Sequence, residues 1–252
     1  MLGVEAHRAL RAQAVGRAAA SATPRAVPLR SGRVSPPSAR RPAAWRLALR
    51  PVLKRAFDLA GALALIVALL PVLLMIALLV RADGGPALFA HERIGRGGRR
   101  FGCLKFRSMV VDSAERLEAL LAADPEARAQ WEATRKLKRD PRVTTIGRFL
   151  RASSLDELPQ LINVLRGEMS LVGPRPVQAA ELAAHYGPVA AAHYASVRPG
   201  MTGLWQVSGR NDTSYAERVA LDLHYVSNPT LLGDLRILLR TPFAVLGRRG
   251  AY

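Results

Sequence analysis

The sequence predicts an α+β protein that is mainly helical, with one re-entrant or kinked membrane helix and a cytoplasmic domain that holds a small β-hairpin and interfacial amphipathic helices. Two observations carry this prediction. The uncharged run of 22 residues from Leu59 to Val80 is long enough, at about 1.5 Å per residue, to cross a bilayer core of roughly 30 Å. The chain after this run shows short strand-like segments, glycine turns and helix-start signals.

Composition divides the chain into three segments. Residues 1–45 are rich in Ala, Arg, Pro and Ser without apolar periodicity, which predicts a disordered basic tail. Residues 46–85 form the predicted membrane-inserted helical segment, and residues 86–252 form the predicted cytoplasmic domain. The chain has a formal net charge of +18, and residues 1–55 hold twelve Lys and Arg against one acid. This balance favours anionic partners such as nucleic acid, acidic lipid headgroups or phosphorylated substrates, without choosing among them.

Basic residues flank the apolar run on both sides. The positive-inside tendency therefore gives no preferred orientation, and it is best satisfied if both ends of the helix stay cytoplasmic. Pro71 lies near the middle of the run, where it removes a backbone hydrogen bond and permits a kink. We favour a helix that dips into the membrane and returns over one that crosses it. The remaining alternative is a buried core helix.

A β-hairpin is predicted directly after the apolar run. Strand-like segments at residues 87–94 and 99–109 flank the glycine-rich turn at residues 95–98. Lys105 and Arg107 follow the two-residue period of the second strand, so both are expected on one face of it. That face is either simply solvated or provides phosphate ligands beside an active site.

Helices are predicted further along. Asp112 opens a capping-box-like helix that runs to about Ala123, and Asp124 with Pro125 begins a second helix. The leucine-rich segment 231–246 predicts a helix that either packs in the core or lies as an amphipathic helix at the membrane interface.

The metal-binding side chains in the sequence are few. Cys103 is the only cysteine, so an intrachain disulfide and a cysteine metal cluster are both excluded. The five histidines are scattered without metal-ligand spacing. Any metal is therefore expected to be a hard cation held by carboxylates and substrate phosphates.

Two adjacent acids, Asp156 and Glu157, are the strongest candidates for chemistry. Ser154 and Glu157 have the spacing of a capping box, and Pro159 is tolerated only in the first turn of a helix. Both acids are therefore predicted at a helix N-terminus. They either only cap that helix or use its positive dipole end, which would keep Asp156 ionised for attack on phosphorus while free backbone N–H groups bind a phosphate.

Two further segments fit phosphate chemistry. The Gly-Pro-Arg-Pro sequence at 173–176 holds Arg175 on a stiff turn, and its paired donors match phosphate oxygens, although an exposed turn arginine is the alternative. Arg151 adds the positive charge that pyrophosphate cleavage needs. The glycine-rich segment 198–212, which contains Trp205, either folds over a nucleobase or sugar or is an ordinary loop.

Taken together, these motifs resemble those of the bacterial polyprenyl-phosphate sugar-1-phosphate transferases, the monotopic phosphoglycosyl transferase superfamily, over about residues 53–252. The motifs that carry the resemblance are, in chain order, Lys54-Arg-x-x-Asp58, Arg93-x-Gly95-x-x-Gly98, Lys105-Phe-Arg-Ser-Met, Ser154-Leu-Asp-Glu-Leu-Pro-Gln, Met169-Ser-Leu-Val-Gly-Pro-Arg-Pro and Gly203-Leu-Trp-Gln-Val-Ser-Gly-Arg.

The resemblance implies a mechanism. It implies that Asp156 is the nucleophile, with Glu157 beside it, and that Asp156 attacks the sugar-bearing β-phosphate of a UDP-sugar and releases UMP. Undecaprenyl phosphate would then take the sugar phosphate from the phospho-aspartyl intermediate. Mg²⁺ is expected at the diphosphate, with Asp156 as its ligand. The resemblance also implies a membrane helix broken by a Ser-Pro pair, but Leu70 stands before Pro71 in this chain.

Further site residues follow from the same resemblance. Lys105, Arg151, Arg175 and Arg210 match basic positions expected to hold phosphates, and Asp222 matches an acid of the same site.

The resemblance also implies a biological setting. The Leu-Trp-Gln-Val segment and the chain ending look like the branch that starts exopolysaccharide repeat units with galactose or glucose, with a slight preference for galactose. An N-acetylated sugar for another surface glycan is the alternative. The chain looks like a short, catalytic-core form of the family. The expected partners are a UDP-sugar, undecaprenyl phosphate and the cytoplasmic face of the bacterial inner membrane, with no nucleic acid. A hypothesis from another class is a non-catalytic, membrane-tethered protein that binds polyanions.

Overall fold

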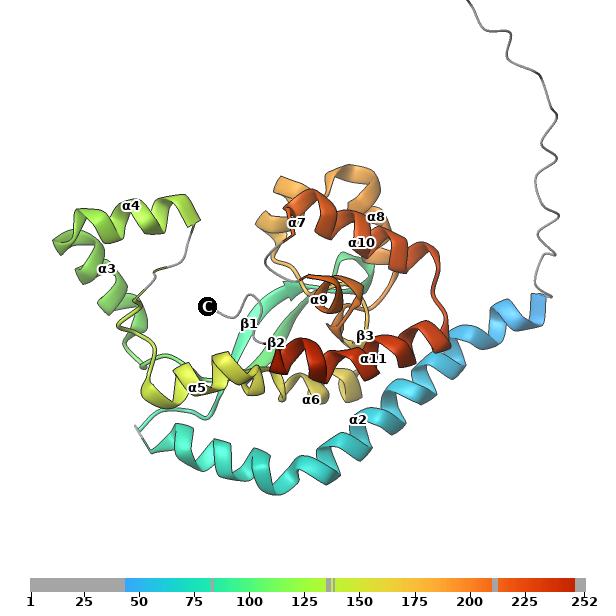
Figure 1. Cartoon of the computed structure of the whole chain (residues 1–252), viewed down its shortest axis with the longest axis horizontal. Coiled ribbons are helices and arrows are strands. Elements are labelled where there is room, and N and C mark those ends of the chain that lie inside the picture. The colour runs from blue at the N-terminus through green and yellow to red at the C-terminus, as the bar shows by residue number, and fades with distance from the viewer. Residues whose placement is uncertain (1–43, 83, 135–136, 138, 210–212, 248–252) are drawn as a thin grey trace, which may run out of the picture. The chain divides into compact units, whose positions relative to one another are not determined.

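One long helix, a set of shorter helices and two small sheets make up the fold (Figure 1). The computed structural model describes residues 44–82, 84–134, 137, 139–209 and 213–247. The predicted basic tail at residues 1–45 therefore lies almost entirely outside the described residues. The prediction of a mainly helical α+β fold with one long apolar helix is confirmed.

Helix α2 (Ala44–Arg81) contains the predicted membrane segment and continues without interruption through Pro51 and Pro71. Figure 1 shows α2 curved along its length. Pro71 has no N–H to donate to the carbonyl of Val67 one turn earlier, and a proline inside a helix bends it for this reason. Within Ala44–Arg81 the structure therefore has the kinked form of the predicted helix and no break between two separate helices.

The surface of α2 is largely apolar and uncovered. Only 11% of its most apolar 18-residue window is buried, and the side chains of Leu63, Val67 and Leu78 are exposed. By length and composition, α2 is the one helix in the described part of the chain that could cross a membrane. A contiguous apolar surface of this size is unfavourable in water, so the alternative of a buried core helix is wrong.

A buried ion cluster fastens the N-terminal half of α2 to the rest of the fold. The ammonium of Lys54 lies 2.8 Å from the carboxylate of Asp58 and 3.1 Å from that of Asp234. Asp58 also accepts hydrogen bonds from the Ser170 hydroxyl and the Leu171 N–H. Buried carboxylates are tolerated only when they are paired and hydrogen-bonded, and this cluster meets both conditions.

The predicted β-hairpin is present. Strands β1 (Leu88–Ile94) and β2 (Arg100–Phe106) are antiparallel, with Phe89 opposite Lys105. The connection η1 (Arg96–Gly98) has left-handed glycines, which is why the turn sequence is rich in this residue.

The remaining helices and strands are, in chain order, α3 (Ser113–Ala123), α4 (Pro125–Thr134), α5 (Thr145–Ser153), η2 (Leu155–Glu157), α6 (Gln160–Arg166), β3 (Ser170–Val172), α7 (Ala179–His185), α8 (Gly187–Ser196), β4 (Gly200–Thr202), α9 (Leu204–Ser208), α10 (Tyr215–Ser227) and α11 (Leu231–Leu246).

The two helices expected after the hairpin are α3 and α4. Asp124 caps α4 as predicted, because its carboxylate accepts hydrogen bonds from the N–H groups of Glu126 and Ala127. The capping box predicted at Asp112 is wrong. The Asp112 carboxylate instead pairs with Arg116 on the outer surface of α3, at 2.9 Å.

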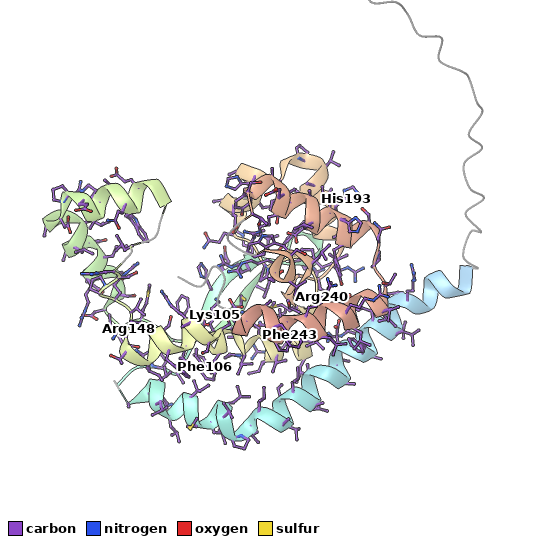
Figure 2. The ribbon with its side chains drawn as sticks, viewed as in Figure 1. Lys105, Phe106, Arg148, His193, Arg240 and Phe243 are labelled. Atoms are coloured by element: carbon purple, nitrogen blue, oxygen red, sulfur yellow. The ribbon has the colours of Figure 1, made fainter. Side chains whose placement is uncertain are left out.

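The main core surrounds the short parallel pair of β3 and β4. It is formed by eight buried side chains, Ala62, Cys103, Leu161, Val164, Met169, Leu171, Val172 and Ile237. Helix α11 contributes Ile237 to this core, while Leu239 and Phe243 lie exposed on its other side (Figure 2 labels Phe243). Helix α11 is therefore amphipathic, with one face in the core and an apolar face outside, as an interfacial helix requires.

Candidate active site

Asp156 and Glu157 lie in a short 3-10 turn, η2, that joins α5 to α6. Helix α5 ends where Ser154 adopts a left-handed conformation, with φ of 57°, and donates its N–H to the carbonyl of Arg151. The predicted capping box is therefore wrong, because the Ser154 side chain makes no capping bond and α6 begins only after Pro159. The two acids are positioned by the α5–α6 connection and not by the first turn of α6.

Lys105 lies between the two carboxylates. Its ammonium is 2.7 Å from Oε1 of Glu157 and 3.5 Å from Oδ2 of Asp156 (Lys105 is labelled in Figure 2). The hairpin strand β2 carries this lysine to the η2 turn. Of the two alternatives for the strand face, solvated or beside the candidate site, the structure has Lys105 beside the acidic pair, and its role as a phosphate ligand stays a prediction.

Burial raises the pKa of Asp156 above its ordinary value. The positive charge of Lys105 opposes this shift, the charge of Glu157 adds to it, and a hydrogen bond from Lys105 and the charge of Arg151 also oppose it. A helix dipole can add little to the ionisation of this carboxyl, since η2 is a single turn and desolvation is the largest effect on its pKa. Asp156 is a poorly solvated carboxylate, which makes it a stronger nucleophile once it is ionised.

Arg175 borders the acidic pair from a second segment. Its guanidinium lies 3.9 Å from Oε1 of Glu157, and about a third of its side chain is exposed. Gly173 lets this turn lie directly on β4, because a Cβ at Gly173 would meet the carbonyl of Arg198 at 2.6 Å and the N–H nitrogen of Gly200 at 2.8 Å. The stiff turn predicted from the two prolines thus directs Arg175 toward Glu157.

Arg151 and Arg107 have different surroundings. Arg151 lies in the last turn of α5 and donates to the hydroxyl of Ser108 at 2.9 Å. Arg107 is buried, and its guanidinium donates to the backbone carbonyls of Pro86, Met109 and Val80. Arg107 therefore holds the C-terminal end of α2 against the hairpin, so its donors are occupied by the protein itself.

Of the two remaining predicted site residues, only Asp222 belongs to the part of the chain that the structure describes. Arg210 lies outside the described residues. Asp222 is buried on α10, where it accepts a hydrogen bond from the hydroxyl of Tyr186 at 2.8 Å. Burial raises the pKa of Asp222 to about 6, while the Tyr186 hydrogen bond and the charges of Arg218 and Arg175 oppose the shift. Asp222 lies beneath the cleft and not in its lining.

The acidic pair opens into a cleft of about 2110 Å³. One wall is apolar and combines Phe57, Ala64 and Leu65 of α2 with Leu238 and Val245 of α11. This wall connects the carboxylates directly to the apolar surfaces of the two helices. A ligand with a phosphate head and a hydrocarbon tail matches this combination of surfaces.

The opposite part of the cleft contains residues that sequence analysis missed. Glu181 of α7 and Tyr215 and Arg218 of α10 line it together with Trp205 of α9, whose segment was predicted either to fold over a nucleobase or sugar or to be an ordinary loop. The hydroxyl of Tyr215 donates to the carboxylate of Glu181, and Arg218 pairs with the same carboxylate at 3.0 Å. No motif connects these positions in the sequence, because they come from separate helices.

The carboxylates of Asp156 and Glu157 could hold a divalent cation only together with a bound substrate. No three His, Cys, Asp or Glu side chains gather into a cage within the residues that the structure describes. Asp156 and Glu157 present two neighbouring carboxylates in the cleft. Mg²⁺ in nucleotide sites is commonly held by one or two carboxylates together with phosphate oxygens and water, so these acids suit a cation that arrives with a diphosphate.

Comparison with known proteins places this chain in a family. The bacterial sugar transferase family matches residues 49–248. The chain is 59% identical over 200 residues to a UDP-galactose-lipid carrier transferase of Erwinia amylovora, and 53% identical over 200 residues to an undecaprenyl-phosphate galactose phosphotransferase of Salmonella typhimurium. Each match covers 79% of this chain and 42% of the relative, so the chain spans less than half the length of these two proteins.

A shorter relative matches over nearly its whole length. The exopolysaccharide production protein ExoY of Sinorhizobium fredii is 50% identical over 209 residues, which cover 81% of this chain and 92% of the relative. The candidate site lies entirely within the matched regions of the chain.

Proposed function

The chain belongs to the bacterial sugar transferase family, and from this premise we propose that it transfers hexose-1-phosphate from a UDP-sugar to undecaprenyl phosphate. The observation that supports this reaction best is the buried Asp156 carboxylate, which lies beside Lys105 in a cleft that continues into an apolar helix surface. A nucleophile, a cation for phosphate oxygens and a lipid-facing wall are the components that such a transfer needs.

We propose that Asp156 performs the first step. Its ionised carboxylate attacks the β-phosphorus of the UDP-sugar, and a new P–O bond forms as the bond from that phosphorus to the bridging oxygen breaks. UMP leaves with the electron pair, and the sugar phosphate stays on Asp156 as a phospho-aspartyl group. Because the carboxylate is poorly solvated, it loses little hydration when it reaches the phosphorus.

The second step uses the lipid. A phosphate oxygen of undecaprenyl phosphate attacks the same phosphorus, and Asp156 leaves as a carboxylate. The apolar wall formed by α2 and α11 suits the isoprenoid chain, since it leads from the acidic pair to the exposed apolar surface of α2. We place the reaction at the cytoplasmic face of the bacterial inner membrane. With both ends of α2 on that face, the basic residues that flank the apolar run would satisfy the positive-inside tendency.

The cationic side chains stabilise the phosphates in this proposal. Lys105 and Arg175 border the acidic pair, and the charge of Arg151 acts on Asp156. The transition state of phosphoryl transfer spreads negative charge over several oxygens, which these cations can stabilise. Mg²⁺ bound at the diphosphate, with Asp156 as its protein ligand, would neutralise part of the same charge. Arg107 is left out of this set because its donors serve backbone carbonyls.

Galactose is the sugar that we propose first, with glucose next. The two relatives above with the higher identities carry galactose in their names, and the ExoY relative is named for exopolysaccharide production. We therefore propose that the product is the first lipid-linked sugar of an exopolysaccharide repeat unit. An N-acetylated sugar is the alternative donor.

Release of UMP from a panel of UDP-sugars tests this function. The purified full chain, with Mg²⁺ and undecaprenyl phosphate in detergent, should give the highest kcat/KM with UDP-galactose, followed by UDP-glucose and then the N-acetylated donors. Without the lipid, one equivalent of UMP should appear as a burst. If no UDP-sugar yields UMP and the chain instead binds duplex DNA with a steep salt dependence, the polyanion-binding hypothesis is favoured.

A further inference from the structure

Arg218 is a buried residue of α10 that lines the cleft together with residues of α7 and α9. About nine-tenths of its side chain is covered, and its Nη1 atom pairs with the Glu181 carboxylate at 3.0 Å. The guanidinium carbon lies 4.7 Å from the ring centre of Trp205 and 4.9 Å from that of Tyr215. Cation–π contacts and one ion pair thus hold the group in a single orientation.

Two donor atoms of Arg218 have no acceptor among the residues that the structure describes. They are Nε and Nη2, and both are shielded from solvent. In a guanidinium these two atoms form one edge, whose parallel N–H bonds match two oxygens of a phosphate. Buried donors without acceptors are unfavourable, so a complete edge of this kind indicates a missing ligand and not a purely structural arginine.

The position of Arg218 relative to the acidic pair indicates which ligand this is. Arg175 lies 3.9 Å from Glu157 on one side and 5.8 Å from the ring centre of Trp205 on its other side. Arg218 contacts the same tryptophan, at 4.7 Å from its ring centre, so Arg175 and Arg218 share Trp205 as a neighbour. All of these side chains line the same cleft.

The lipid substrate is not the ligand that this position suits. The apolar wall of the cleft comes from α2 and α11, whereas Arg218 lies on α10, which Figure 1 shows on the far side of β1 and β2 from α2. A nucleoside monophosphate has a phosphate that accepts two parallel hydrogen bonds, which the fork of Arg218 can donate, and a flat base, for which Trp205 is the aromatic neighbour in the same cleft. The ring of Tyr215 is already stacked with that of His185 at 3.7 Å.

We propose that the free edge of Arg218 binds the α-phosphate of the nucleoside diphosphate sugar, with Trp205 beside its nucleoside. Arg175 then faces the phosphate that is transferred, and Arg218 faces the phosphate that leaves with UMP. Glu181 acts as a positioning residue, because it fixes the guanidinium through Nη1 and the phenol of Tyr215. This inference rests on the proposed function and assigns the donor half of its site.

Binding of UMP, the leaving product, tests the inference without turnover. Trp45 and Trp131 are replaced by Phe, so that Trp205 is the only tryptophan of the chain. Titration of this protein with UMP in the presence of Mg²⁺ should change the Trp205 fluorescence. This measurement keeps Arg218 intact, so it does not depend on whether an Arg218 variant folds. A saturating UMP concentration that leaves the fluorescence unchanged overturns the proposal.

Arg218→Lys then tests the fork itself. Lysine keeps the charge but offers no parallel pair of donors, so the Kd for UMP and the KM for the UDP-sugar should both rise about tenfold or more. The KM for undecaprenyl phosphate should stay within about twofold. Arg218→Gln, which removes the charge and leaves a shorter neutral amide, should weaken the binding of UMP further. Arg100→Lys is the matched control, since Arg100 also pairs with a glutamate, Glu92 at 3.1 Å, but on an exposed strand.

The possible outcomes separate this inference from the proposed function. If the wild-type chain releases no UMP from any donor, the proposed function fails. If it does turn over but Arg218→Lys keeps the wild-type Kd for UMP, the donor-site inference is wrong and Arg218 is only structural. A rise in the KM for the UDP-sugar with an unchanged Kd for UMP also overturns it, because the fork would then hold the sugar half.

Discussion

The ammonium of Lys105 lies 3.5 Å from Oδ2 of Asp156, although the two residues are 51 positions apart. This contact joins the β2 strand to the η2 turn and sets the local electrostatics of the site. Burial raises the pKa of Asp156 and the lysine charge opposes that shift, so the reactivity of the carboxylate depends on a residue from another element.

Asp156→Asn should lower the rate of UMP release at least about a thousandfold, because a neutral amide oxygen does not attack phosphorus. Labelled sugar phosphate should be trapped on the wild-type chain in the absence of lipid and not on this variant. Asp112→Asn is the control, since Asp112 is an exposed acid paired only with Arg116 among described partners. A variant that keeps most of its activity would show that another residue is the nucleophile.

Lys105→Met should move the acidic limb of the kcat/KM profile for UMP release to higher pH. The positive charge of Lys105 lowers the pKa of Asp156 against the effect of burial, so its removal raises that pKa further. The reactive form is the carboxylate, and it is populated only above this pKa. Lys105→Arg keeps the charge and should leave the limb close to its wild-type position. Superimposable profiles for the wild type and Lys105→Met would refute the electrostatic role.

Arg107→Ala should destabilise the fold by about 3 kcal/mol, because three backbone carbonyls lose a charged donor and a buried side chain is removed. Thermal unfolding in detergent measures this loss. The KM for the UDP-sugar should change little for the protein that remains folded. The opposite result, normal stability with a much higher KM, would show that Arg107 contacts phosphate as the strand pattern first indicated.

Asp222→Asn should change how stability depends on pH. Folding raises the pKa of Asp222 from 3.8 to about 6, so the folded state favours the protonated acid. The stability that this proton contributes is complete below about pH 4 and is lost as the pH rises through 6. Over this range the free energy of unfolding of the wild type should fall by about 3 kcal/mol relative to that of the Asp222→Asn variant, which has no such proton to lose. Unfolding of both proteins at intervals between pH 4 and 7 measures the difference. A difference that is constant over this range would contradict the raised pKa.

Cysteine labelling tests how α2 lies in the membrane. A cysteine at Ser35 and, in a second variant, one at Ala82 should both be labelled from the cytoplasmic side if α2 enters and leaves on one face. The wild-type chain serves as the background, because its single cysteine, Cys103, is buried and should not react. Labelling of the Ser35 position from the periplasm alone would refute the re-entrant arrangement.

The sequence predicted those parts of the site that depend on neighbouring residues. Asp156 and Glu157 are adjacent, and the prolines around Arg175 restrict its turn whatever surrounds it. Predictions that assumed that a regular strand or helix continues along the chain were less successful. Lys105 and Arg107 follow the two-residue period, but β2 ends at Phe106, so Arg107 leaves the strand and turns to the carbonyl of Val80.

The Ser154 capping box shows the same limit. Its residue pattern is correct, but the backbone at Ser154 is left-handed because α5 ends there, and a capping serine needs an extended backbone. Whether a helix begins or ends at a given serine depends on how the two flanking helices pack. That information is not local to the four residues of the pattern.

The sequence by itself determined the apolar helix, the hairpin, the adjacent acids and the family of the chain, because each depends on composition or on residues close together in the chain. Only the tertiary structure decided that Lys105 faces Asp156, that Asp222 lies beneath the cleft, and that Arg218 meets Glu181 from another helix. Burial and pairing between distant elements set the pKa values and leave the unpartnered donors of Arg218, and neither can be read from spacing along one segment.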